Sequence, residues 1–451
     1  MNELNNICPL DGRYQKDLKI LREYFSEGAL IKYRAEIEKK YLIALLRLLS
    51  ARGGSAFGGK KASVPELKKI SQIKINAARV KKIESITNHD VKAVEYYLKE
   101  ELKKLKFSNN VLELVHFALT SEDINNLAYS LMWKDALEKV YLPELNKNIK
   151  ELKKLAQKHK AQTILSMTHG QPATPTTLGK EMAVFVYRLN RQLKFSPLLG
   201  KLSGATSNWA AHYVAYPKID WFKFSEKFVK SLGLELNPLT IQIESHDSLA
   251  ENYQQVMRIN NVCKDFSRDM WLYISRGIFK QKVVKGEIGS STMPHKVNPI
   301  RFENAEGNLG MSNAIFDFMA NKLTISRMQR DLSDSTVLRN QGLALGYSFL
   351  ALRNINKGLT RVQANNEKIK EELDHNWEVL AEPIQTVLRK LGYSGAYEEL
   401  KKLTRGKKLN QEILIKFVDN LKIPKEEKEQ LKKLTPFNYN GISEKLIKYI
   451  K

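Results

Sequence analysis

Between residues 290 and 299 the chain has the sequence SSTMPHKVNP, which follows the glycine-punctuated segment GEIG at 286–289. The stretch carries two serine hydroxyls, the ammonium group of Lys296 and the amide of Asn298, and no apolar periodicity passes through it. A loop that presents such groups without building a core is a candidate for chemistry. We therefore expect an active-site loop here, and the flanking segments indicate which fold carries it.

Long helical patterns flank this loop. The residues Thr120-Ser121-Glu122-Asp123 supply a helix cap and an acidic first turn, and apolar residues follow them at helical spacing. Further helices are expected from about residue 177, from 246 to about 279, from about 302, and over about 333–359. Five helices, several of them longer than usual, indicate an all-α protein built on a central bundle.

We expect three helical domains, at 1–110, 111–360 and 361–451. The central domain holds the five-helix bundle and the catalytic loops, whereas the helical patterns of the last domain are shorter and are broken at Gly392, Gly406 and Pro424. The segment from 160 to 177 contains Gly170, Pro172 and Pro175 and is expected to be a structured loop.

Size and composition predict a globular, cytoplasmic protein. The chain has 451 residues, 43% of them hydrophobic, which is enough for a large buried core. It contains no apolar run long enough to span a membrane, and its N-terminus lacks the basic-then-apolar pattern of a secretory signal. The only cysteines, Cys8 and Cys263, are no disulfide framework and fit a reducing compartment.

The net charge of +25 has two possible interpretations, an anionic partner or solvated helix faces rich in lysine. The lysines are interleaved with acids and leucines, as on exposed helix faces, so the second interpretation is favoured and no nucleic-acid partner is expected.

The side chains of the loop at 290–299 fit proton abstraction beside a carboxylate. That step needs a base for a carbon-bound proton and donors aimed at the developing negative charge. Ser290 can be the base only if nearby cations and amides stabilise its alkoxide, and Lys296 and Asn298 supply such groups. The alternative is a serine-rich surface turn.

Two histidines stand in further motifs. His169 lies in THGQPATP at 168–175, where an imidazole could give a proton to a leaving nitrogen; the alternative is a structural loop histidine. His89 follows Asn88 and precedes Asp90, and we expect Asn88 or Thr87 to cap a helix that has Asp90 in its first turn. A solvated histidine beside a cap is the alternative, although a helix N-terminus is also a natural anion site.

Two arginine-bearing segments complete the candidates. Arg13 and Tyr14 lie in DGRY at 11–14, and Arg330, Ser335 and Arg339 lie in RMQRDLSDSTVLRN at 327–340. Guanidinium groups suit phosphate and carboxylate, although each segment alone is also typical of surface ion pairing. The sequence has no P-loop string, metal-spaced Cys/His cluster, HExxH or GxSxG motif, so no metal site is expected.

The loop at 286–299 resembles the signature loop of the fumarase/aspartase superfamily. His295 stands where fumarases carry glycine, and Gly170 stands where the other branches carry leucine. The strings TNHD at 87–90, TSED at 120–123 and RDLSDS at 330–335 are similar to the adenylosuccinate lyases. This resemblance extends from Asp11 to about Thr404 and is greatest to the bacterial branch with a long N-terminal DGRY segment.

The resemblance implies a homotetramer whose subunits contribute their central helices to one multi-helix core, with each active site built from three chains. It implies elimination of fumarate from adenylosuccinate, giving AMP, and from SAICAR, giving AICAR, in purine biosynthesis. Succinyl nucleotides are then the partners, and no metal or organic cofactor is expected.

The resemblance also implies roles for individual residues, which residue chemistry alone does not order. Ser290 is expected to be the general base and His169 the general acid, with His89 near the leaving group or phosphate, orienting His169. Lys296 and Asn298 are expected to hold the carboxylates and stabilise the carbanion. The remaining substrate contacts are expected from Arg13, Tyr14, Asn88, Asp90, Thr120, Ser121, Gln242, Arg330, Ser335 and Arg339.

Two rival functions stay open from the sequence. One is another fumarate-releasing lyase of the superfamily, and the other is a basic nucleic-acid-binding protein that kept the fold but lost catalysis. Assays of alternative substrates, or RNA binding without lyase activity, would separate them.

Overall fold

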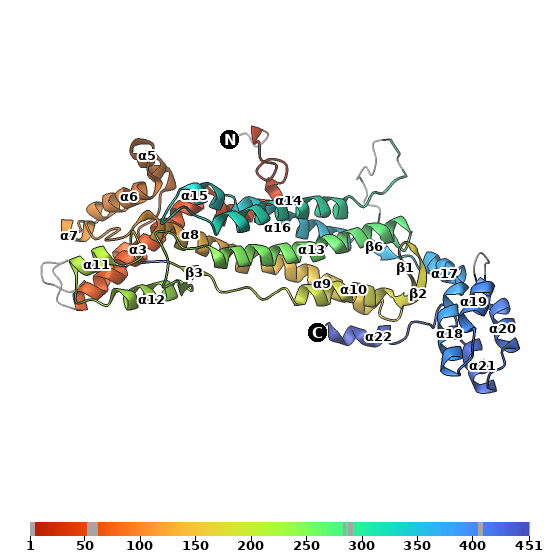
Figure 1. Cartoon of the computed structure of the whole chain (residues 1–451). Helices are drawn as coiled ribbons and strands as arrows, with labels where there is room; N and C mark the ends of the chain where they lie inside the picture. Colours follow the sequence, from red (N-terminus) through yellow and green to blue (C-terminus); the bar gives the residue numbers. More distant parts are fainter. Residues whose placement is uncertain are drawn as a thin grey trace. The chain divides into compact units, whose positions relative to one another are not determined.

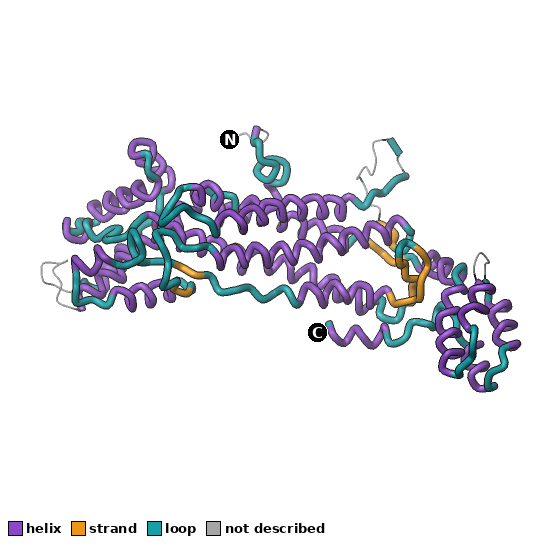
Figure 2. The backbone as a smooth tube through the Cα atoms, in the orientation of Figure 1, coloured by secondary structure: helices purple, strands orange, loops and turns teal. Residues whose placement is uncertain are grey.

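The computed structural model of this chain describes residues 5–51, 62–282, 286, 292–293, 295–404 and 409–450. Helices dominate this part of the chain, and its six strands are short (Figure 2). The expected all-α class is confirmed. Among the described residues, no helix combines the length and the apolar character needed to cross a membrane.

The chain divides into two compact units. Unit 1 comprises Met1–Glu144, Lys194–Asn260 and Asn308–Leu350, and unit 2 comprises Leu145–Leu193, Asn261–Gly307 and Ala351–Lys451. Four helices contribute residues to both units: α9 (Leu142–Lys158), α13 (Asp247–Ser275), α14 (Ile300–Leu323) and α16 (Gln341–Leu359). The three-domain division at residues 110 and 360 stays a prediction.

Unit 1 is built around α3 (Glu27–Ala51), α6 (Asp90–Lys104) and α8 (Ser121–Ala136), which pack on one another, with α5 (Ala77–Thr87) against α6 (Figure 1). Its apolar centre includes Trp133, Tyr253 and Phe316, whose ring centroids lie 4.8 to 5.7 Å apart. Burying large aromatic side chains in this way supplies much of the hydrophobic stabilisation. Its other elements are α1 (Gln15–Leu18), η2 (Lys19–Leu21), α2 (Arg22–Phe25), α4 (Val64–Ser71), α7 (Asn109–Leu112), η4 (Leu137–Tyr141), the parallel pair β3 (Leu199–Gly200) and β4 (Glu235–Leu236), α11 (Ala210–Ala215), α12 (Trp221–Ser231) and α15 (Ser333–Leu338).

Unit 2 contains an antiparallel hairpin of β1 (Thr163–Thr168) and β2 (Gln171–Thr177), with α17 against β1. Phe185, Phe266 and Phe302 form an edge-to-face series in its core. Its other elements are α10 (Leu178–Asn190), the antiparallel pair β5 (Phe279–Gln281) and β6 (Val362–Ala364), α17 (Asn366–Asp374), η5 (Trp377–Leu380), α18 (Ala381–Lys390), α19 (Ala396–Thr404), α20 (Gln411–Asn420), α21 (Lys425–Lys432), α22 (Ser443–Leu446) and η6 (Ile447–Tyr449).

Two local expectations were wrong. The segment at 160–177 is a hairpin rather than a loop, because His169 and Gly170 form a two-residue turn with φ values of 53° and 72°. Two consecutive left-handed residues give the type I′ turn that matches strand twist, and a two-stranded ribbon tolerates prolines at its edges. The helix expected over 333–359 is interrupted after Leu338 and resumes at Gln341.

Candidate active site

The sequence-predicted site residues divide between the units. Unit 2 contains His169, Lys296 and Asn298, and Ser290 lies outside the described residues. Unit 1 contains Arg13, Tyr14, Asn88, His89, Asp90, Thr120, Ser121, Gln242, Arg330, Ser335 and Arg339. The structure links several of the unit 1 residues through polar contacts, some of them buried and some exposed.

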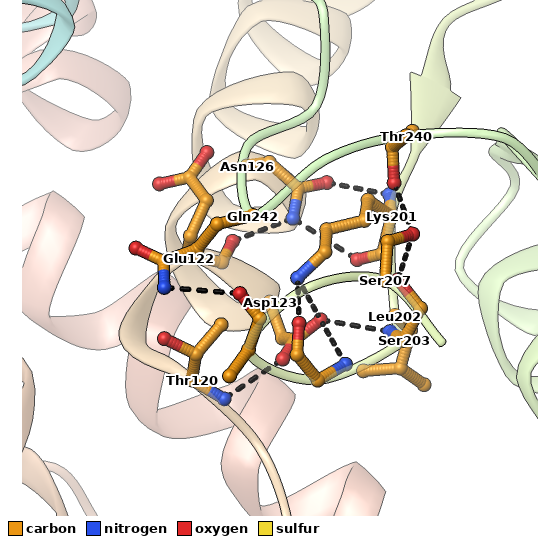
Figure 3. Close-up of polar contacts among 12 residues, drawn as sticks. Thr120, Glu122, Asp123, Asn126, Lys201, Leu202, Ser203, Ser207, Thr240 and Gln242 are labelled. Atoms are coloured by element: carbon orange, nitrogen blue, oxygen red, sulfur yellow. Dashed lines mark hydrogen bonds and ion pairs between the residues drawn. The ribbon is translucent and has the colours of Figure 1, made fainter. Parts of the chain in front are cut away.

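The start of α8 is anchored by a fully buried ion pair. Thr120 caps the helix, as expected, and its backbone N–H donates to Asp123 Oδ2 at 2.8 Å. The other Asp123 oxygen accepts from Lys201 Nζ and from the Ser203 N–H, both at 2.8 Å (Figure 3). Because both charges are shielded from water, these contacts tie Thr120 and Ser121 firmly to the segment at 201–204.

The same segment connects to Gln242. The hydroxyls of Ser207 and Thr240 lie 2.5 Å apart, and Gln242 Nε2 donates to the Ala205 carbonyl at 3.0 Å. The Asn126 amide accepts from the Lys201 N–H and donates to the Lys201 carbonyl (Figure 3). Gln242 is therefore linked to the α8 N-terminus through a network that includes the buried ion pair.

Arg330 reaches the same helix from the α15 side. One guanidinium nitrogen lies 3.2 Å from a carboxylate oxygen of Glu122 and 3.2 Å from one of Asp334, and the other Asp334 oxygen accepts from the Ser335 N–H. Ligand atoms of Glu122, Asp334 and His246 lie within 4.8 Å of one another, a spacing that a metal ion could bridge. Because Arg330 already supplies a cation to both carboxylates, we assign no metal there.

His89 itself caps α6, which corrects the expectation that Asn88 or Thr87 does so. His89 Nδ1 accepts from the Lys92 N–H at 3.2 Å, whereas Asn88 ends α5 in a left-handed conformation with φ of 50°. Asp90 lies in the first turn, as expected. With Nδ1 acting as acceptor, a neutral His89 carries its proton on Nε2, at the ring edge free to face a ligand.

Asp90 joins two arginines beside His89. It accepts from Arg34 Nη2 at 2.8 Å and from Arg339 Nη2 at 3.0 Å. Partial burial pushes the pKa of Asp90 upward, but the charges of Arg34 and Arg339 outweigh it and hold the pKa below its usual value. The structure thus brings Asp90 and Arg339 together, and Arg339 is also paired with Glu27 at 2.7 Å.

Arg34 is a site-supporting residue that sequence reasoning missed. It is 1% exposed, and its Nε donates to Asn125 Oδ1 of α8 at 2.8 Å while Nη2 holds Asp90. Its signal in the sequence is a charge on the buried face of α3, flanked by the buried Ile31 and Ala35. A charged residue in such a position is rarely buried without a partner.

Asp11 of the DGRY segment lines a cavity of about 430 Å³ together with Arg22 and Arg339, whereas Arg13 and Tyr14 are not among the lining residues. The Arg13 guanidinium lies 5.8 Å from the centre of the Tyr14 ring, within the range of a cation–π contact. The cavity therefore places the N-terminal segment and Arg339 at one opening of unit 1.

In unit 2, His169 projects from the β1–β2 turn and is exposed. Lys296 is exposed, its N–H donates to the Met293 carbonyl at 3.1 Å, and Asn298 is half-buried just before α14. The turn and the residues preceding α14 thus present an imidazole, an ammonium group and an amide.

The chain is similar to known proteins both in sequence and in fold. Residues 12–313 match a family model described as Lyase, and residues 326–440 match one described as Adenylosuccinate lyase C-terminal. The fold is shared with a fumarate lyase from Mesorhizobium sp. BNC1 (TM-score 0.74, 18% identity, 96% of this chain and 97% of that chain). It is also shared with the 3-carboxy-cis,cis-muconate lactonizing enzyme of Pseudomonas putida (TM-score 0.73, 20% identity, 96% of each chain).

Relatives found by sequence have a much higher identity to this chain than these two structures. The adenylosuccinate lyase of Escherichia coli (strain K12) is 50% identical over 98% of this chain and 97% of its own length. The adenylosuccinate lyase of Haemophilus influenzae is 50% identical over 99% of both chains. The chain therefore belongs to the adenylosuccinate lyase family.

Proposed function

We propose that this protein eliminates fumarate from adenylosuccinate, giving AMP, and from SAICAR, giving AICAR, in the cytoplasm. The observation that carries the proposal is 50% identity, over 98% of the chain, to an adenylosuccinate lyase. The arginines among the unit 1 candidates, Arg13, Arg330 and Arg339, carry guanidinium groups that suit a phosphate or a carboxylate of such substrates.

In the proposed reaction, Ser290 removes a proton from Cβ of the succinyl group. The electron pair is held as a carbanion delocalised into the adjacent carboxylate, whose charge Lys296 and Asn298 stabilise. The pair then forms the double bond of fumarate as the bond between Cα and nitrogen breaks. His169 gives its proton to the departing nitrogen, so that each proton and electron pair is accounted for.

The remaining groups position the substrate. Thr120 and Ser121, at the α8 N-terminus, would bind a succinyl carboxylate through their side-chain hydroxyls. Arg13, Tyr14 and Arg339 would bind the phosphate, and Arg330 and Ser335 would complete the contacts. His89 would offer Nε2 to the leaving group or phosphate, fixed in place by Asn88 and Asp90, and Gln242 would contact the substrate.

We further propose a homotetramer with active sites shared among three chains. Support comes from exposed apolar side chains on the long helices, which include Val184, Tyr187, Trp271, Leu272, Met311 and Phe318, exposed by 38 to 58%. Side chains of this kind on helix faces are typical of subunit interfaces. Such an assembly would also bring residues of different subunits to one site.

The test is ultraviolet absorbance of adenylosuccinate mixed with the wild type and with Ser290→Ala. The wild type is expected to form AMP, and the variant to be slower by about 10²- to 10⁴-fold, the usual contribution of a general base. Ser291→Ala removes the neighbouring hydroxyl as a matched control and is expected to lose far less.

Other outcomes would assign a different function or base. Turnover of argininosuccinate but not adenylosuccinate would place the protein with another fumarate-releasing lyase. Salt-dependent RNA binding by a folded but inactive wild type would support the non-catalytic alternative. Equal activity of Ser290→Ala and wild type would exclude Ser290 as the base.

A further inference from the structure

A buried group of titratable side chains lies directly behind the α8 N-terminus in unit 1. It consists of Glu122, Glu244, His246 and Asp334, each no more than 5% exposed, and of Arg330; we call it the His246 cluster. Glu122 follows Ser121 in the chain, and Arg330 is itself a proposed substrate contact. The cluster is therefore in contact with two parts of the candidate site, yet the mechanism above does not use His246.

The His246 ring faces a carboxylate on each side. Its Nδ1 lies 3.7 Å from Glu244 Oε2, and its Nε2 lies 3.9 Å from Asp334 Oδ2. Within the described residues neither ring nitrogen has a closer hydrogen-bond partner, and Glu122 Oε1 also lacks one. A neutral imidazole would direct a lone pair at one of these carboxylates, whereas an imidazolium offers an N–H to each.

The backbone holds this ring in place. His246 has a left-handed φ of 60°, which costs energy for any residue with a side chain. Its N–H donates to Glu244 Oε2 at 2.7 Å, and its carbonyl accepts from the Ala250 N–H in the first turn of α13. Strained backbone that persists in a buried position is often associated with function.

The charges around the ring also favour an imidazolium. Glu122 approaches from α8, Glu244 from the ring's own segment, and Asp334 and Arg330 from the α15 side; Lys201 lies farther off, paired with Asp123. Burial alone would lower the pKa of His246, but Asp334, Glu122 and Glu244 outweigh burial and raise it. Burial raises the pKa of Glu122 to about 7, against the charges of His246 and Arg330.

Arg330 is the member of the His246 cluster whose side chain is partly exposed to solvent. Its side chain is 20% exposed, while its inner edge contacts both Glu122 and Asp334 at 3.2 Å. We propose that His246 is a positioning residue that, as an imidazolium, shares Asp334 with Arg330 and so leaves the guanidinium available to an anionic group of the substrate. This inference rests on the proposed function, in which Arg330 binds the succinyl nucleotide.

The consequence is a substrate affinity that depends on the charge of His246. When the ring loses its proton, Arg330 is the only cation of the described part of the chain in contact with Glu122 and Asp334, and these carboxylates bind its guanidinium group more tightly. The substrate must then compete with these carboxylates for the guanidinium. KM should rise while kcat changes little, because the reacting atoms are not touched.

The experiment compares KM and kcat for adenylosuccinate from pH 6 to 9 in the wild type, His246→Gln and His212→Gln. The wild-type KM is expected to rise toward alkaline pH. In His246→Gln, KM is expected to be raised about tenfold at neutral pH and to rise less toward alkaline pH than in the wild type, because only Glu122 of the cluster then titrates in this range, with kcat nearly unchanged. His212 is the matched control, because it is equally buried in unit 1 but its ring contacts Phe117 and Trp221 rather than a carboxylate.

A second variant tests the charge itself. Glu244→Gln keeps the shape of the side chain but removes one of the charges that favour the imidazolium. The alkaline rise in KM should then begin at lower pH, by about one unit. If Glu244 had a purely structural role, the pH at which KM begins to rise would not change.

Three outcomes would overturn the inference. The first is a wild-type KM that does not change from pH 6 to 9, and the second is a pH dependence of KM in His246→Gln that is parallel to that of the wild type. The third is a rise in KM that begins at the same pH in Glu244→Gln as in the wild type. Each of these arises in an active enzyme and leaves the proposed function intact. A folded wild type that does not convert adenylosuccinate would instead overturn the proposed function and this inference together.

Discussion

At the scale of single residues, the ion pair of Asp123 and Lys201 is expected to have a large effect on stability. Both side chains are fully buried, so Lys201→Met leaves an uncompensated carboxylate in the core. We expect the free energy of unfolding to fall by about 3–5 kcal/mol. Urea denaturation followed by circular dichroism, at fixed protein concentration, measures it.

The matched control is Lys104→Met, which breaks an exposed pair with Glu101. Exposed ion pairs contribute little to stability, so this change should leave the free energy of unfolding nearly unaltered. Similar losses in the two variants would contradict a structural role for the buried pair.

His212 gives a prediction for pH. Burial lowers the pKa of His212 to about 4, against an ordinary value of about 6.5 in the unfolded chain. Between these values the unfolded chain binds a proton that the folded protein does not, so stability falls as pH drops from about 6.5 to about 4. In His212→Gln the free energy of unfolding should fall less over this window. Parallel curves for variant and wild type would show that His212 does not titrate in this way.

At the scale of elements, the β1–β2 hairpin sets the position of His169. Gly170 has a φ of 72°, and a Cβ added there would meet nothing within 4 Å. The energetic cost of replacing Gly170 therefore comes from the backbone conformation and not from a steric clash. Asparagine tolerates this left-handed conformation, whereas a β-branched residue does not. Gly170→Val should therefore distort the turn and lower kcat about tenfold or more, and Gly170→Asn should stay near wild type.

Initial rates with adenylosuccinate measure both variants. Equal activity of Gly170→Val and wild type would mean that the turn does not control His169, the proposed general acid. An equal loss in Gly170→Asn would indicate that the absence of a side chain, rather than the left-handed conformation, is what the site requires.

At the scale of the whole molecule, the proposed tetramer predicts that a charge on an exposed helix face disrupts assembly. Phe318 of α14 is 58% exposed in the single chain. Phe318→Glu would place a carboxylate in the subunit interface and should lower both the mass in solution and lyase activity. Light scattering after size-exclusion chromatography measures the mass.

Tyr397 of α19 is 57% exposed and serves as the control. It lies outside the long helices, so Tyr397→Glu should leave the mass and the activity as they are in the wild type. A monomeric but fully active wild type would contradict the shared-site assembly.

The sequence by itself determined what depends on neighbouring residues. Thr120 begins α8 and Thr177 begins α10, as expected, because a cap and its first turn interact within about four positions. The family could also be identified from short strings, since they contain the reactive groups themselves. The hairpin at His169 was missed because its two prolines are equally typical of a loop.

Tertiary structure decided which partners the buried charged groups meet. Asp123 and Lys201 are 78 residues apart, Arg34 and Asn125 are 91 apart, and Arg330 and Glu122 are 208 apart. No local periodicity specifies such pairs, because the cost of burying each charge is offset only by a partner that the packed fold supplies. The candidate site residues were therefore visible in the sequence, whereas the buried residues that contact those of unit 1 required the three-dimensional structure.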